Sequence, residues 1–169
     1  MSTEPTTILA IDPGYERLGI ALMKKSGSHK EEVLFSECFK TSPQEDFVDR
    51  LHRIGDRITE LIEKYDPEIM AIENLFFTSN QKTAMRVAEV RGALLYIARA
   101  QGLSIHEFTP KEIKVAITGY GAGTKDDIIF MMPKLVDVDV KNMVDDEVDA
   151  IAVGITCFAH NRHRHLSTS

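Results

Sequence analysis

The chain has 169 residues, of which 43% are hydrophobic and 27% charged, and its formal net charge is −6. This length predicts one domain, residues 1–169, and the composition excludes a disordered chain. Cys38 and Cys157 form neither a disulfide framework nor a zinc pattern, and no apolar run is long enough for a signal sequence or a membrane span, so we expect a cytoplasmic protein with no membrane partner.

Three short strands are predicted before the first helix. Residues 7–11 form a β-branched and aliphatic run that stops at Asp12-Pro13-Gly14, a sequence typical of a turn. Residues 18–23 follow too closely for an intervening helix, so the two runs predict an antiparallel pair. Residues 33–39 predict a third strand.

Helices and strands alternate in the rest of the chain. Ser42-Pro43-Gln44-Glu45 has the pattern of a capped helix start, and the apolar positions that follow recur at helical spacing. The expected elements are then a helix to residue 65, a strand over 69–73, a helix from Ser79 to about Gln101, a strand over 103–108, helices that open at Thr109 and Thr124, and a last helix from about Asp146 to about Ala159. Pro133 is expected to end or kink its helix.

This order of elements predicts an α/β fold. The first three strands would form an antiparallel half of a mixed five-stranded sheet, and the later strands would add parallel β-α-β units. Helices would cover both faces of the sheet. Residues 1–6 and 162–169 are expected to be flexible ends.

Four acidic residues lie where a chain usually avoids charge. Asp12 and Glu73 end apolar strands, and Asp146 and Asp149 open a helix that is otherwise nearly all apolar and share one of its faces. Ligands of open α/β sheets bind beyond the carboxyl ends of the strands, where these acids would converge. Oxygen ligands select Mg²⁺ or Mn²⁺, and two such ions can clamp a phosphodiester displacement.

Each acid also has an ordinary structural interpretation. Asp12 is a common turn residue, and Glu73 could cap a helix or pair with an arginine. Asp146 could be a helix N-cap, and Asp149 a favourable charge near a helix N-terminus. The residues alone leave both interpretations open.

The chain resembles the RuvC family of Holliday junction resolvases from about Ile8 to His160. The motifs that carry the resemblance are, in order, Ile8-Leu9-Ala10-Ile11-Asp12-Pro13-Gly14, Ala71-Ile72-Glu73-Asn74-Leu75-Phe76, Ala88-Glu89-Val90-Arg91-Gly92, Gly119-Tyr120-Gly121 with Thr124-Lys125, and Asp146-Glu147-Val148-Asp149-Ala150-Ile151-Ala152. The resemblance implies an RNase H-like fold. It also implies a homodimer that resolves four-way DNA junctions by paired symmetric nicks in recombination and repair, in partnership with a branch-migration complex of the RuvA–RuvB type.

The same resemblance implies roles for the acids. Asp12, Glu73, Asp146 and Asp149 would be the catalytic residues that bind two Mg²⁺ ions, for which Mn²⁺ could substitute. Asp12 would lie between the ions, Glu73 would hold one of them, and the Asp146/Asp149 pair would hold the other.

Basic and aromatic residues are expected to contact DNA. Phe76 matches the family's aromatic at the junction centre, and Phe77 follows it, although core packing is the ordinary interpretation of both. Lys114 and Lys125 match family lysines near the scissile phosphate, and Lys125 could also stabilise the transition state. Lys82 and Arg86 are four residues apart and suit a phosphate track or an ordinary solvated helix face.

Two residues depart from the family pattern and bear on DNA affinity. Asp127 stands where the family commonly has Gln, and Pro133 interrupts a helix that usually continues. His160, His163 and His165 are interpreted as part of a disordered tail rather than a metal site.

Charge is distributed unevenly along the chain. Residues 31–69 hold 11 acidic and 5 basic side chains, and residues 126–149 hold 8 and 2. Basic side chains are in excess in the middle of the chain. Residues 79–101 hold 4 basic and 1 acidic side chains, and residues 103–125 hold 3 basic and 2 acidic side chains. The net charge therefore does not exclude DNA, and we expect residues 31–69 to face away from it.

Two other functions fit parts of the sequence. A YqgF-like nuclease that acts on RNA begins with a similar motif at Asp12, but residues 74–77 and 119–125 follow the resolvase pattern. A DNA-binding module without catalysis would not need all four acids.

Overall fold

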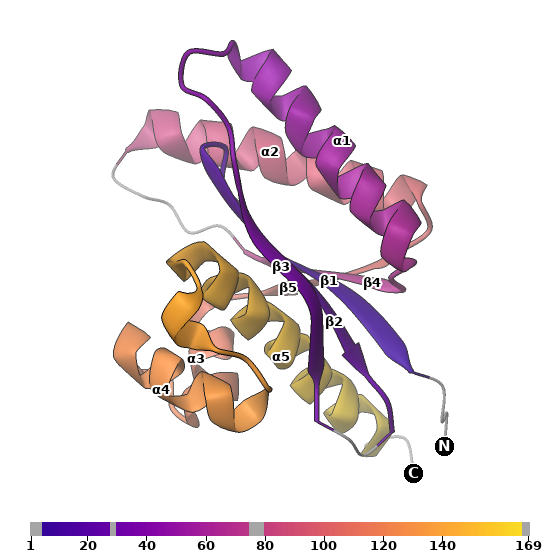
Figure 1. Ribbon diagram of the computed structural model, residues 1–169, viewed down its shortest axis with the longest axis vertical. Coiled ribbons are helices and arrows are strands. Elements are labelled where there is room, and N and C mark those ends of the chain that lie inside the picture. Colours follow the sequence, from indigo (N-terminus) through magenta and orange to yellow (C-terminus); the bar gives the residue numbers. More distant parts are fainter. Residues whose placement is uncertain (1–4, 28–29, 75–79, 167–169) are drawn as a thin grey trace.

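The computed structural model describes residues 5–27, 30–74 and 80–166, which form one mixed sheet between two helical layers (Figure 1). The strands are β1 (Thr6–Asp12), β2 (Arg17–Lys25), β3 (Glu32–Lys40), β4 (Ile69–Glu73) and β5 (Ser104–Phe108). The helices are α1 (Phe47–Tyr65), α2 (Gln81–Ala100), α3 (Pro110–Thr118), α4 (Lys125–Leu135), the 3-10 helix η1 (Val140–Asn142) and α5 (Asp145–Leu166). Phe76 and Phe77 lie outside the described residues.

The sheet has the predicted mixture of strand directions. Its order is β3-β2-β1-β4-β5, in which β1 pairs antiparallel with β2 and β2 with β3. β4 pairs parallel with both β1 and β5. Each parallel step is joined through a helix, as parallel neighbours require. The structure therefore confirms the α/β fold class.

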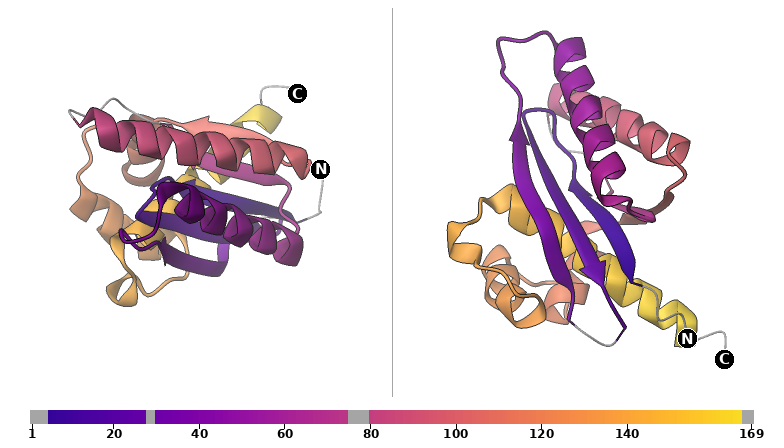
Figure 2. Two further views of the ribbon diagram at one scale, coloured as in Figure 1. Left: turned by 90° about the horizontal axis from the view of Figure 1, so that it is seen from above. Right: turned by 45° about the vertical axis from the view of Figure 1, so that its right-hand side comes forward.

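Helices cover both faces of the sheet because its central strands are apolar on both sides. In β1, Ile8 and Ala10 pack in the core formed with α3, α4 and α5, whereas Leu9 and Ile11 pack in the core formed with α1 and α2. Figure 2 shows α1 and α2 together on one side and α5 on the other. A strand buried on both faces reads as a continuous apolar run, which is how β1 and β4 look in the sequence.

Two of the three predicted capping boxes are present. The hydroxyl oxygens of Thr109 and Thr124 each accept a hydrogen bond from the backbone N–H three residues later, and Glu112 and Asp127 reach back to them. The box expected at Ser42 is wrong. α1 begins at Phe47, and the Glu45 carboxylate binds Arg53 at 2.7 and 2.8 Å instead of reaching back.

Other helix ends also differ from the predictions. α2 begins after Asn80, whose side chain accepts a hydrogen bond from the backbone N–H of Thr83 at 3.2 Å. Pro133 does not end α4, which continues to Leu135. α5 extends past the expected end at Ala159 to Leu166, so the chain is helical over 162–166, where we expected a flexible end. None of the helices in the described ranges is long and apolar enough to cross a membrane.

Candidate active site

Asp12 and Glu73 lie side by side at one edge of the sheet. β1 and β4 run parallel, with Ile11 opposite Ile72, and each of the two acids is the last residue of its strand. Both carboxylates therefore emerge at the carboxyl ends of adjacent strands, where open α/β sheets bind their ligands. The apolar strand residues before each acid anchor it in the core.

The first turns of α5 reach the same edge and bring Asp146 and Asp149. The backbone oxygen of Asp146 lies against Gly19, which is paired with Asp12 in the β1–β2 register. The Ser36 hydroxyl donates a hydrogen bond to Glu147 at 2.9 Å and fixes the helix start on β3. The four predicted acids thus lie at the same edge of the sheet.

Asp12 experiences the other three acids directly. Burial, together with the negative charges of Glu73, Asp149 and Asp146, raises the pKa of Asp12 to about 8, although the charge of Lys125 acts in the opposite direction. A carboxylate among like charges disfavours its own ionised form. Asp12 is therefore the acid on which the charges of the other three act together. A cation bound next to Asp12 would offset this repulsion.

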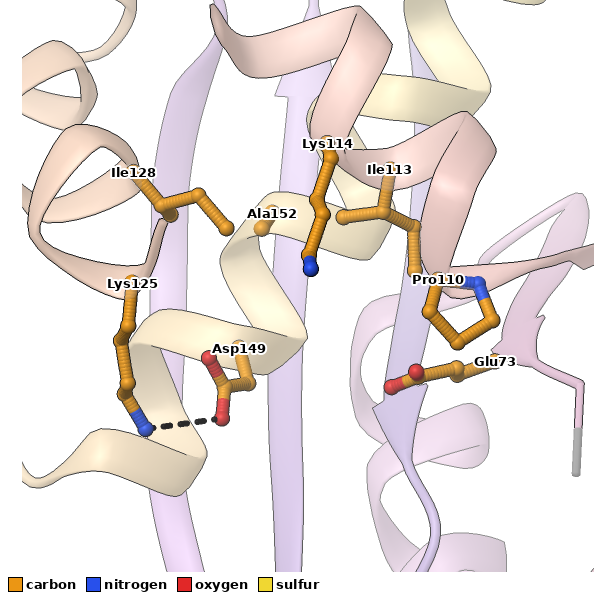
Figure 3. Close-up of a pocket in the computed structure, with 8 residues that line it drawn as sticks. All are labelled: Glu73, Pro110, Ile113, Lys114, Lys125, Ile128, Asp149 and Ala152. Carbon is orange, nitrogen blue, oxygen red and sulfur yellow. Dashed lines mark hydrogen bonds and ion pairs between the residues drawn. The ribbon is translucent and has the colours of Figure 1, made fainter. Parts of the chain in front are cut away.

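Glu73 and Asp149 line one pocket, in which the Glu73 carboxylate points toward Asp149 and the Asp149 carboxylate is turned toward Lys125 (Figure 3). Burial raises the pKa of Glu73, and the charge of Asp149 adds to this effect. Burial also raises the pKa of Asp149, although Lys125 acts in the opposite direction. The pocket is lined by Glu73, Pro110, Ile113, Lys114, Lys125, Ile128, Asp149 and Ala152.

Asp146 and Asp149 have different cationic partners. Arg17 donates to one oxygen of Asp146 through Nη2 at 2.5 Å and Nε at 2.9 Å. Burial works to raise the pKa of Asp146, but the hydrogen bond and charge of Arg17 outweigh it, and the pKa is lowered. Lys125 Nζ lies 3.3 Å from Asp149 and 3.1 Å from Asp145. Asp146 and Asp149 therefore turn their carboxylates toward different cations, Arg17 and Lys125, and not toward one common point.

The donor set fits a hard divalent cation in its chemistry. All four candidate ligands are carboxylates, and oxygen ligands are those preferred by Mg²⁺ and Mn²⁺. Across the described ranges, no three His, Cys, Asp or Glu side chains are already grouped closely enough to hold one ion. Coordination would require Asp146 and Asp149 to turn from Arg17 and Lys125.

The predicted DNA-contacting lysines are divided between the two faces of the sheet. Lys114 of α3 and Lys125 at the start of α4 line the acidic pocket. Lys82 and Arg86 lie on α2, on the opposite face, where Arg86 pairs with Glu89 at 3.0 Å and lies over the Phe47 ring. The structure therefore brings the first pair to the acids but not the second pair.

Several residues of this edge were not anticipated from the sequence. Arg17, Cys38 and Asp145 contact the predicted acids or their lysine, and Gly19 lies between two of them. Only Gly19 carried a usable signal, because a glycine inside an apolar strand indicates close approach of another backbone. The contacts of Arg17 join segments 129 residues apart, which no local pattern predicts.

Comparisons with known proteins agree with this geometry. The sequence model of a family described as "Crossover junction endodeoxyribonuclease RuvC" matches residues 8–157. Proteins of that name from Moorella thermoacetica and Petrotoga mobilis are 38% and 36% identical, over 88% and 93% of this chain and 88% and 94% of theirs. The solved structure titled "T. thermophilus RuvC in complex with Holliday junction substrate" superimposes with a TM-score of 0.84 at 30% identity, covering 89% of this chain and 92% of the other.

Proposed function

The chain belongs to the RuvC family of crossover junction endodeoxyribonucleases, and on that premise we propose which of its residues bind, position and cut a four-way DNA junction. One observation carries the proposal. Asp12 lies half-buried at the carboxyl edge of the sheet, and three other acids raise its pKa. Grouping negative charges in this way destabilises the folded chain, and residues with strongly shifted pKa values are typical of functional sites.

The metal of this metal-dependent nuclease family would be held by Asp12, Glu73, Asp146 and Asp149. We assign it as Mg²⁺, two ions per site with Mn²⁺ as a substitute, because the donors are all carboxylate oxygens. When bound, these ions supply the Lewis-acid chemistry that activates water and offsets charge at the phosphodiester. Asp12, whose pKa the other three acids raise, would contribute to both ions.

Two lysines face the acids from the other wall of the pocket. Burial works to lower the pKa of Lys125, but Asp145 and Asp149 outweigh it and the pKa is raised, so the ammonium group stays charged. Lys125 and Lys114 would then neutralise the scissile phosphate, and Lys125 would stabilise the charge that develops in the transition state. Ile113 and Ile128 supply the apolar part of the same wall.

Junction recognition would extend beyond the pocket. Phe76 and Phe77 follow β4 and Glu73 in the sequence, and stacking of Phe76 on an unpaired base would contribute about 1–3 kcal/mol. Lys82 and Arg86 would form a phosphate track on α2, where Glu89 competes for Arg86. The acidic residues of α1 lie on that same face with α2, on the opposite side of the sheet from Lys114 and Lys125. The strand β3 of the same 31–69 range nevertheless reaches the start of α5, through Ser36 and Cys38.

An exposed apolar stripe on α2 suits a homodimer contact. Met85 and Tyr96 are 66% and 76% exposed, and the small residues Ala88 and Gly92 lie between them at helical spacing. A Cβ on Gly92 would meet no atom within 4 Å, so this part of the helix is open to a close partner. A second copy related by two-fold symmetry would present a second acidic edge, as paired nicks require. We also propose a RuvA–RuvB-type branch-migration complex as a partner, and the cytoplasm as the site of action.

The test compares three substrates. A synthetic four-way junction, a linear duplex of the same sequence and a structured RNA are incubated with the protein, with Mg²⁺ and with EDTA. We expect symmetric paired nicks in the junction, and only with Mg²⁺. Cleavage of RNA without cleavage of the junction would overturn the proposal.

A matched pair of variants tests the acids. Glu73→Gln should retain junction binding and lose at least about 100-fold in cleavage rate, the size of effect expected when a group acting on the transition state is removed. Glu63→Gln changes an exposed acid of α1 and should cleave normally. Cleavage by Glu73→Gln at the unchanged rate would show that the acids do not act as assigned.

A further inference from the structure

Gly19 of β2 is the point at which two of the acidic elements meet. It is buried and paired with Asp12 in the β1–β2 register. A Cβ placed on Gly19 would lie 3.1 Å from the Cβ of Asp12 and would overlap with the backbone oxygen of Asp146. Gly19 is not among the glycines with positive φ, so its backbone suits any residue, and the requirement for glycine is one of space.

We propose that Gly19 is a positioning residue that sets the separation between Asp12 and Asp146 and thereby the affinity of the site for its divalent cations. This inference rests on the proposed function of the acids. Any side chain at position 19 must push the start of α5 away from β2, because the nearest atoms that it meets belong to the backbone of Asp146. Asp149 belongs to the next turn of the same rigid helix and would move with it.

The start of α5 has little freedom to accommodate this push by sliding. Ser36 holds Glu147 at 2.9 Å, and Arg17 holds Asp146 at 2.5 Å. Further along the helix, a Cβ on Gly154 would lie 3.2 Å from the Cβ of Ala10, so the helix is also seated closely on β1 there. Displacement at position 19 is therefore concentrated on the segment that carries the acids.

Gly154 provides a matched control on the same helix and sheet. A Cβ there would also meet the Sδ atom of Met23, so Gly154→Ala disturbs the same interface more than one turn beyond Asp149. Met23 is a flexible side chain that can shift alone, whereas the Asp146 carbonyl opposite Gly19 is backbone and moves only with α5. The pair separates a general loss of packing from a specific change at the acidic edge.

The experiment measures Mn²⁺ binding to the junction-free protein by isothermal titration calorimetry. Wild type, Gly19→Ala and Gly154→Ala are compared, and circular dichroism establishes that each is folded. We expect Gly19→Ala to weaken Mn²⁺ binding at least about tenfold, a change of about 1.4 kcal/mol. Gly154→Ala should stay within about twofold even where its melting temperature falls. Unchanged affinity in Gly19→Ala, or equal weakening in both variants, would overturn the proposal.

A second readout separates positioning from a general loss of structure. Gly19→Ala should bind the junction with unchanged affinity and cut it more slowly. If Gly19→Ala is not folded in buffer, the titrations are repeated for all three proteins with trimethylamine N-oxide, which favours compact states. Glu73→Gln is titrated in parallel. If it binds Mn²⁺ normally, the assignment of the acids fails; if it loses binding while Gly19→Ala keeps it, only the role of Gly19 fails.

Discussion

Arg17 and Asp146 form an ion pair in which two guanidinium nitrogens approach the same carboxylate oxygen, Nη2 at 2.5 Å and Nε at 2.9 Å. The pair joins the first residue of β2 to the first turn of α5. It lowers the pKa of Asp146 and so keeps this carboxylate ionised. Asp146, which we propose as a metal ligand, is therefore bound to Arg17 in this structure.

Arg17 and the divalent cation would therefore compete for Asp146. Arg17→Gln removes the competitor and one positive charge from the acidic edge, so the Mg²⁺ concentration for half-maximal junction cleavage should fall, by up to about tenfold. A Mg²⁺ titration of the cleavage rate measures it. Arg53→Gln, which loses a pair with Glu45 away from the site, should leave the titration unchanged. A higher Mg²⁺ requirement in Arg17→Gln would show that Arg17 supports binding.

The raised pKa of Asp12 predicts how the metal-free protein responds to pH. The ordinary pKa of this carboxyl is 3.8, and in the folded chain it is about 8. Between these values the folded chain keeps a proton that the unfolded chain has lost, so this group makes the stability fall as pH rises from about 4 to about 8, with no further change above.

Asp12→Asn should remove that dependence. In EDTA, the variant should gain stability over wild type between pH 5 and pH 8, by at least about 1.4 kcal/mol, the equivalent of one pKa unit. Urea unfolding at the two pH values measures the difference. Asp56→Asn, an exposed position on α1, serves as the control. Parallel stability curves for wild type and Asp12→Asn would contradict the raised pKa.

Arg50 anchors the turn that follows Asp12. Its side chain is only 6% exposed and donates to the Thr41 hydroxyl at 2.9 Å and to the Tyr15 carbonyl at 3.3 Å. Arg50→Met should lower the free energy of unfolding by about 1–3 kcal/mol, because buried polar partners lose a charged donor. Urea denaturation measures the loss. Arg53→Met, on the same helix but half-exposed, should cost less than about 1 kcal/mol, and an equal cost would refute the anchoring role.

The α2 stripe predicts the behaviour of a dimer-breaking variant. Tyr96→Glu places a charge on an exposed apolar position and should shift the protein toward monomer in analytical ultracentrifugation, since unpaired charges are costly to bury at an interface. Paired nicks at one junction should give way to single nicks. Val48→Glu changes a comparably exposed apolar residue of α1 and should leave the monomer–dimer equilibrium unchanged in the same measurement. A Tyr96→Glu protein with wild-type association would move the contact elsewhere.

Most elements of the fold could be predicted because their signals are local. The capping boxes at Thr109 and Thr124 depend on residues three apart, and the structure contains both. Ser42 carries the same pattern, yet α1 starts later, at Phe47, and the Glu45 carboxylate pairs with Arg53 instead of with the predicted helix start. A local pattern decides the outcome only where no partner from elsewhere competes for the same side chain.

The sequence by itself determined the order of strands and helices, the fold class and the placement of the four acids at element ends. Periodicity and turn residues act between neighbours in the chain, so they can be read from it. The tertiary structure alone decided that Asp146 meets Arg17, that Asp149 meets Lys125, and that Gly19 lies beneath the start of α5. These contacts depend on how α5 crosses the sheet, which is fixed by the packing of both faces together.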